Sequence, residues 1–282
     1  MSEDIHPATS PGPRHIDEDL HGARFERTDL RDSTFHTVDL KGSRFEQVHL
    51  TDATFRSTEL RRVVMRGVEL QDVEITGELL DVTINGVDVV PLVEAELDRR
   101  DPDRPRMRPT DPDGFREAWD TVERLWAGTV ERARTLPPEQ LHASVDGEWS
   151  FVETLRHLAF ATDAWVGRGV LGDPSPWHPL DLPWDDMPPT TGVPRDRQVR
   201  PSLDEALELR HARMSTVREV VDGLDEGALD RMTTPVDAPG WPPPGRSFPV
   251  RDCLLVVLNE EYHHRLFAER DLAALAAHPD AS

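Results

Sequence analysis

The chain has 282 residues, a formal net charge of −22 and a single cysteine, Cys253. This length suggests two domains, and the acidic charge argues against binding to nucleic-acid backbones or anionic membrane surfaces. One cysteine excludes an internal disulfide framework and fits a reducing compartment, and no apolar run is long enough to span a bilayer. We therefore expect a cytoplasmic protein with no nucleic-acid and no membrane partner. Residues 1–15 carry no signal-peptide pattern and are predicted to be a disordered tail.

Large apolar residues then recur at every fifth position, a period that neither an α-helix nor a β-strand has. A small or β-branched residue stands two positions before most of them. If the chain turns by about 90° in every five residues, four such units close a square coil, and successive coils stack about 4.8 Å apart. The large residues would then fill the axis of the coil. The series is Leu20, Phe25, Leu30, Phe35, Leu40, Phe45, Leu50, Phe55, Leu60, Met65, Leu70, Ile75 and Leu80.

This pattern resembles the pentapeptide-repeat family. The resemblance implies a right-handed quadrilateral β-helix over residues 16–90, with about three coils and a need for caps at its ends. Such a rod is expected to dock a protein partner or to form a homodimer. Some relatives mimic duplex DNA, but the basic residues spread through this segment dilute such mimicry.

The rest of the chain predicts helices, so the fold class is α+β with more than one domain. Residues 91–111 are expected to form a capping helix and a linker rich in proline. A four-helix bundle is predicted over residues 112–276, followed by a tail over 277–282. Its helices are expected at 115–135, from the capping box that starts at Ser150, from a second capping box at Ser202 to about 224, and at 249–276.

Three side chains in this region have the pattern of metal ligands. Glu260 and His264 are four residues apart on one predicted helix, so their Cβ atoms lie about 6 Å from each other. His157, in the middle of the second predicted helix, would complete a set of two imidazoles and one carboxylate. Three protein ligands leave a coordination position open, as in catalytic sites. The alternatives are that His157 is a hydrogen-bonded core residue and that Glu260 and His264 lie on a solvated face.

The order of the helices, the mid-helix His157 and the Glu260-x-x-x-His264-Arg265 motif resemble the DinB-like superfamily. The resemblance covers residues 112–276 and implies one divalent metal on His157, Glu260 and His264, with zinc expected first and nickel or manganese as alternatives. Glutamate at position 260 is the variant of the mycothiol-dependent maleylpyruvate isomerases. The implied activity is that of a transferase or isomerase in which the metal activates mycothiol or another small thiol as a thiolate, which then attacks an electrophile.

Other residues offer weaker candidates. Arg265 is expected either to bind a carboxylate of a substrate or to pair with Glu261, and His263 either to assist catalysis or to be exposed. Trp149 and Trp165 are candidate walls of a substrate pocket, although tryptophan in a bundle is usually core. Cys253 lies in an apolar run and is expected to be an inert buried thiol. The alternative function is a non-catalytic scaffold that binds proteins through the acidic repeat rod.

Overall fold

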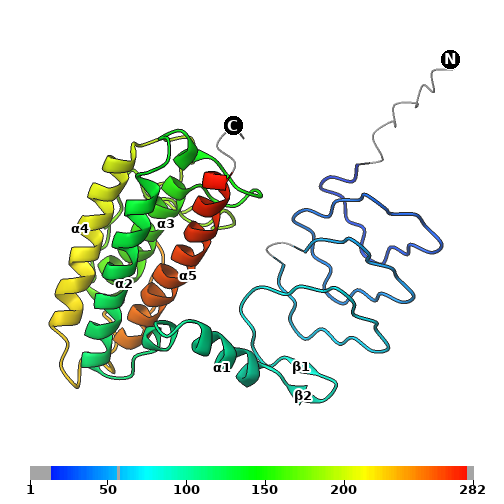
Figure 1. Ribbon diagram of the computed structural model, residues 1–282, viewed down its shortest axis with the longest axis horizontal. Coiled ribbons are helices and arrows are strands. Elements are labelled where there is room, and N and C mark those ends of the chain that lie inside the picture. Colours follow the sequence, from blue (N-terminus) through cyan, green and yellow to red (C-terminus); the bar gives the residue numbers. More distant parts are fainter. Residues whose placement is uncertain (1–13, 56–57, 278–282) are drawn as a thin grey trace. The chain divides into compact units, whose positions relative to one another are not determined.

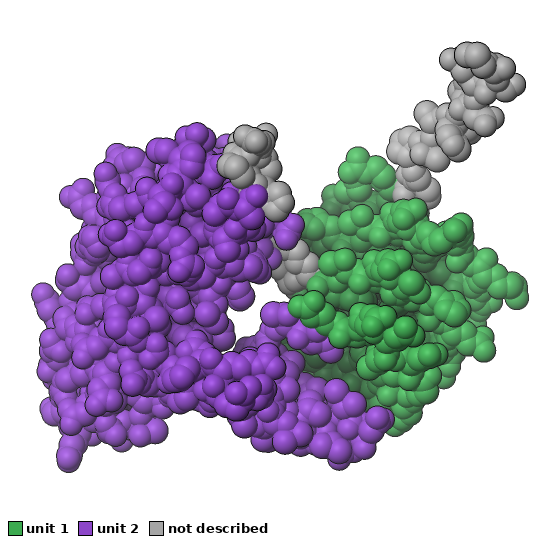
Figure 2. Space-filling view, in the orientation of Figure 1, with its two compact units in different colours: residues 1–74 green, residues 75–282 purple. Residues whose placement is uncertain are grey.

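The computed structural model describes residues 14–55 and 58–277 and divides the chain into two compact units, residues 1–74 and 75–282 (Figure 2). Most of the two predicted tails, 1–15 and 277–282, therefore lies outside the described residues.

The first unit turns once in every five residues, as the sequence predicts. From Leu20 to Ile75, a residue with a positive φ stands two positions after each central residue except Phe55, for which that position lies outside the described residues; after Leu80 the positive φ is at Asp81. Between Leu20 and Ala53 a short hydrogen bond closes every second turn, as in Ala23 N–H to Leu20 O (2.9 Å) and Ser43 N–H to Leu40 O (3.0 Å). Figure 1 shows this segment winding in successive loops. The positions with positive φ are Asp17, Gly22, Arg27, Asp32, Thr37, Gly42, Gln47, Asp52, Arg62, Gly67, Asp72 and Gly77.

The expected burial of the large apolar residues is wrong for this structure. The central residues from Leu20 to Leu80 are 44–74 % exposed, and no described residue before Thr83 belongs to a strand. Among the described residues 14–55 and 58–81, the backbone hydrogen bonds stay within one turn, and no strand ladder joins neighbouring loops. The periodic coil is thus present, whereas the β-helix remains a prediction.

The second unit opens with a hairpin and a short helix. Strands β1 (Thr83–Ile84) and β2 (Val87–Asp88) pair antiparallel around Asn85-Gly86, both with positive φ, as a tight hairpin turn requires. Helix α1 (Val90–Arg100) follows, with proline at its start, where a missing N–H costs nothing. The predicted helix after Pro91 is therefore confirmed.

Four longer helices form the predicted bundle (Figure 1). Each packs against two of the others: α2 and α3 both contact α4 and α5. Helices α3 and α4 begin at the predicted capping boxes. In each box the serine side chain accepts a hydrogen bond from the backbone N–H of the glutamate three residues later, and the glutamate side chain accepts one from the backbone N–H of the serine. The helices are α2 (Pro112–Ala133), α3 (Phe151–Thr162), α4 (Leu203–Asp222) and α5 (Val250–Ala277).

The core of the bundle is one continuous cluster of apolar side chains. Phe115, Trp119 and Val122 of α2 are buried against Leu158 of α3 and Leu254 of α5, among others. Burying each such side chain contributes about 1.5–3 kcal/mol before the cost of ordering the chain. This packing fixes the positions of α3 and α5, which carry the predicted metal ligands.

Two buried arginines hold the long irregular connections in place. The guanidinium of Arg156 donates to the carbonyls of Leu180 (2.7 Å), Asp196 (2.6 Å) and Val199 (3.0 Å). Arg168, on the π-helical continuation of α3 (Asp163–Val170), donates in the same way to carbonyls of two other loop segments. The 171–202 connection has no helix or strand of its own, so its backbone polar groups depend on such partners.

Candidate metal site

His157, Glu260 and His264 lie together between α3 and α5. The Nε2 atom of His157 is 3.3 Å from Oε2 of Glu260, and Nδ1 of His264 is 3.2 Å from the same oxygen. One ligand atom from each residue lies within 4.8 Å of those of the other two. The side chains are 7, 28 and 21 % exposed respectively, so the cluster is recessed but reaches solvent.

Hydrogen bonds hold both imidazoles in place, and in His157 they leave Nε2 directed to the cluster. His157 Nδ1 lies 3.0 Å from the carbonyl oxygen of Leu182, to which it donates, and His264 Nδ1 lies 3.0 Å from the carbonyl oxygen of Glu260. In a neutral imidazole the other nitrogen, Nε2, is then an acceptor. Such bonds fix the tautomer and the ring orientation of histidines that bind metals. Nε2 of His157 and the carboxylate of Glu260 are two acceptors at 3.3 Å, so a cation or a proton must lie between them.

The protonation of the cluster suits a cation site at neutral pH. Burial opposes ionisation of Glu260, but the hydrogen bond from His157 and the charge of the two histidines outweigh it, so that the pKa of Glu260 is lowered. Burial and the neighbouring His157 lower the pKa of His264 to about 4. At neutral pH the carboxylate is therefore charged and the His264 imidazole is neutral, the states in which both bind metals.

Aromatic rings surround the cluster. The ring of Trp149 lies 4.4 Å from that of His157 and is stacked at 5.9 Å on that of His264. On the other side Phe160 lies 6.2 Å from His157 and begins a chain of ring contacts through the two long connections. The further members of this chain are Trp177, Trp184 and Trp241.

The other sequence candidates lie elsewhere. Trp165 packs edge-on against Phe248 at 5.4 Å, and the His263 ring contacts Tyr262. The expected pairing of Arg265 with Glu261 is wrong: Arg265 lies 3.8 Å from Glu269. Glu261 instead pairs with Arg210 of α4 (2.7 Å), because its side chain points about 100° around α5 from that of Glu260. Of the proposed pocket residues, only Trp149 contacts the cluster.

Cys253 behaves as the sequence suggests. The thiol is buried, and burial and the neighbouring Asp252 raise its pKa to about 11. A thiol with so high a pKa stays protonated and is a poor nucleophile.

A pair of buried carboxyl groups, absent from the sequence predictions, supports the turn that carries the Leu182 carbonyl. Asp163 binds the guanidinium of Arg213 (2.7 Å), and Asp181 accepts the backbone N–H of His178 (2.8 Å). The two carboxyl groups lie close enough for each to affect the pKa of the other. Burial and the neighbouring Asp163 raise the pKa of Asp181 to about 8, so Asp181 is mostly protonated at neutral pH.

This pair predicts a pH-dependent stability that Asp181→Asn removes. The folded state keeps the proton up to about pH 8, whereas the unfolded chain releases it near pH 4, so the free energy of unfolding falls as the pH rises between these values. The variant is expected to have the same melting temperature as the wild type near pH 4. At pH 8 its melting temperature is expected to be about 4–8 °C higher, which corresponds to a difference of roughly 2 kcal/mol in the free energy of unfolding. Melting curves across this range measure the effect, with Asp185→Asn as the exposed control. A difference independent of pH would contradict the assignment.

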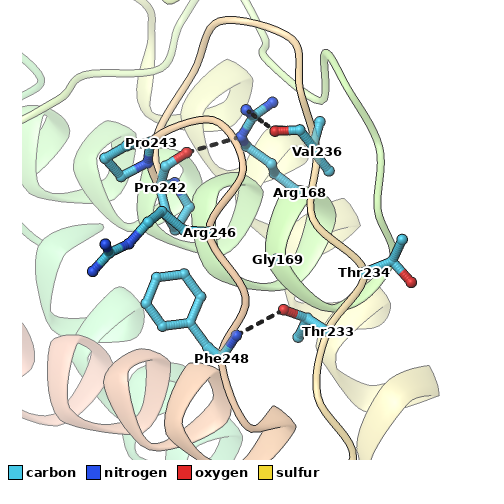
Figure 3. A pocket seen from close by; sticks show the side chains of 9 residues that line it. All are labelled: Arg168, Gly169, Thr233, Thr234, Val236, Pro242, Pro243, Arg246 and Phe248. Atoms are coloured by element: carbon cyan, nitrogen blue, oxygen red, sulfur yellow. Dashed lines mark hydrogen bonds between the residues drawn. The ribbon is translucent and has the colours of Figure 1, made fainter.

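A separate small cavity of about 10 Å³ lies beside the 233–248 connection, lined in part by Arg168, Pro242 and Phe248 (Figure 3). None of the three clustered residues lines it. The Arg168 guanidinium is already bonded to carbonyl oxygens, so this cavity is part of the packing of the connection.

Comparison with known families identifies the bundle. A family model described as the DinB superfamily matches residues 121–268, more than half of the chain. The chain belongs to the DinB superfamily. A second model, pentapeptide repeats (9 copies), matches residues 20–64, which confirms the fusion expected from the sequence. No curated protein and no solved structure matches this DinB-superfamily chain.

Members of the DinB superfamily bind a divalent metal, and the His157–Glu260–His264 cluster is a grouping in this chain that could hold one. Among the described residues, no helix combines the length and the apolarity that crossing a membrane requires.

Proposed function

We propose that this protein is a divalent-metal-dependent enzyme, a transferase or isomerase that uses a low-molecular-weight thiol of the mycothiol type. His157, Glu260 and His264 would hold the ion, with zinc as the first choice. The observation that carries the proposal is the convergence of two imidazoles and a carboxylate in one recessed cluster of a DinB-superfamily bundle.

The donor set fits such an ion. Two neutral imidazoles and one carboxylate are ligands that zinc accepts, and a three-residue set leaves a fourth position open for a small molecule. His157 already donates through Nδ1 to a backbone carbonyl, the arrangement that presents its Nε2 to a metal. When bound, the ion supplies a charge that lowers the pKa of a coordinated thiol from about 8.5 and so favours the thiolate.

The chain's own residues would position the two reactants. Trp149 covers one side of the two imidazoles and limits the access of water to the cluster. Phe160 and the tryptophans beyond it offer an apolar surface to the carbon skeleton of an electrophile. Arg265 lies 3.8 Å from Glu269, too far for a hydrogen bond, so binding of a substrate carboxylate by Arg265 stays a prediction.

Thermal unfolding of the zinc-loaded protein with added thiols tests the proposal. Mycothiol or glutathione at about 100 times its Kd is expected to stabilise the protein by about 2.7 kcal/mol. The S-methylated form of the same compound cannot become a thiolate and is expected to give a much smaller shift. Equal shifts for the thiol and its S-methyl form, or a shift that survives in zinc-free protein, would contradict thiol activation.

A protein partner or a homodimer through the pentapeptide-repeat unit remains part of the proposal. The regular turn in every five residues supports a scaffold role for this unit beside catalysis in the bundle. Light scattering of the full chain distinguishes a dimer from a monomer.

A further inference from the structure

Two adjacent glutamates of α5 face different helices. Successive side chains of an α-helix point about 100° apart. Glu260 faces His157 of α3, whereas Oε2 of Glu261 lies 2.7 Å from Nη2 of Arg210 on α4. The side chains of Arg210 and Glu261 are only 2 and 1 % exposed, so this is a fully enclosed ion pair one residue away from a proposed ligand.

The apolar pattern of α5 does not by itself determine which way the helix is turned. Residues 253–258 are six consecutive apolar residues, and all six are buried or half-buried. A helix that is apolar all round can rotate with little change in the apolar area that it buries. The rotation of this part of α5 must therefore be specified by polar contacts.

The Arg210–Glu261 pair is well placed to provide that specification. An enclosed ion pair contributes little net stability, because desolvation opposes the attraction, but it forms in only one arrangement of the two helices. Arg210 is itself held in the core, with its guanidinium 5.7 Å from the centre of the Trp126 ring. Turning α5 by one residue would break the pair and leave a buried arginine without its carboxylate.

We propose that the Arg210–Glu261 ion pair fixes the rotation of α5, so that Glu260 and His264 face His157 while the second glutamate is kept away from the metal. Arg210 and Glu261 are thus positioning residues. This inference deepens the proposed function and rests on the metal site that it assumes. The hydrogen bond from the Tyr262 hydroxyl to Asp101 is the competing explanation for the same rotation.

The test removes the pair without leaving a buried charge. In the full-length protein, Arg210→Met/Glu261→Met is expected to keep its melting temperature within a few degrees. Its zinc affinity is expected to fall about 10- to 100-fold, in the range seen for residues that orient metal ligands. The visible spectrum of the cobalt-loaded protein is expected to change as well, because the ligands of the ion are rearranged.

The matched control is Arg251→Met/Asp230→Met, which removes a more exposed ion pair (2.7 Å) between α5 and the connection that precedes it. It should leave zinc affinity and the cobalt spectrum unchanged. If the Arg210 double variant also leaves both unchanged, the Tyr262–Asp101 contact suffices and the inference is wrong. A wild-type protein that binds no zinc would instead contradict the proposed function.

A milder variant covers the case in which the double variant fails to fold. Arg210→Lys keeps the positive charge but loses the planar guanidinium that fits the carboxylate. We expect a loss of zinc affinity of about 3-fold or more, intermediate between the wild type and the double variant. An unchanged affinity and cobalt spectrum in this folded variant would overturn the inference.

Discussion

His157→Ala and His264→Ala are each expected to lower the affinity for zinc by about 100-fold or more. Each substitution removes one of three protein ligands, and loss even of a residue that only orients a ligand costs 10- to 100-fold. Glu260→Gln keeps the shape of the side chain but removes its charge and is expected to weaken binding as well. Competition with a chromogenic chelator measures all three affinities on purified protein.

His263→Ala is the matched control for these variants. His263 is the neighbour of His264 on α5, is half-buried and contacts Tyr262 instead of the cluster. Zinc affinity should therefore stay within about 3-fold of the wild type. If His157 and Glu260 form only an ion pair within the core, no variant will change metal binding, because the wild type will have none to lose.

Arg156→Met is expected to be the most destabilising single change among the residues that hold the long connections. Arg156 is 1 % exposed, and its loss leaves three carbonyl oxygens of the 180–199 segment without their donor. We expect a loss of about 3 kcal/mol, which lowers the melting temperature by about 6–12 °C in a domain of this size. Zinc affinity should fall too, because the same segment supplies the Leu182 carbonyl that orients His157.

Arg197→Met provides the comparison for Arg156. Arg197 lies in the 171–202 connection that Arg156 binds and pairs with Glu153 (2.9 Å) and Asp185 (2.9 Å), but it is 41 % exposed. Exposed pairs contribute about 0–1 kcal/mol, so this variant should melt within about 4 °C of the wild type. Equal melting temperatures for the two variants would contradict the conclusion that the hydrogen bonds of Arg156 hold the 171–202 connection in place.

The helices of the bundle could be predicted because their signals are local. Ser150 and Ser202 each stand three residues before a glutamate, and the structure begins α3 and α4 at these capping boxes. The spacing of Glu260 and His264 likewise placed both on one face of α5. The approach of His157 to this pair depends on how α3 packs against α5, and only the family resemblance indicated it.

Some contacts of the connections and the exposure of the repeat residues could not be predicted from the sequence. The contacts of Arg156 and His157 are made to backbone carbonyls, and a carbonyl has no residue type by which a sequence could reveal it. The position of a charged residue, Arg156, within an apolar helical segment was the sequence signal for a buried arginine that binds backbone carbonyls. In the repeat unit the five-residue period predicted the turns but not the exposure of the central residues, since burial depends on contacts between successive loops.

The most direct test of the metal site is the position of the ion itself. Crystals of the protein grown with zinc should give an anomalous scattering peak between α3 and α5, about 2.0–2.2 Å from Nε2 of His157, a ring nitrogen of His264 and a carboxylate oxygen of Glu260. A structure obtained with excess zinc in which His157 Nε2 instead donates directly to Glu260, with no peak between them, would contradict the account.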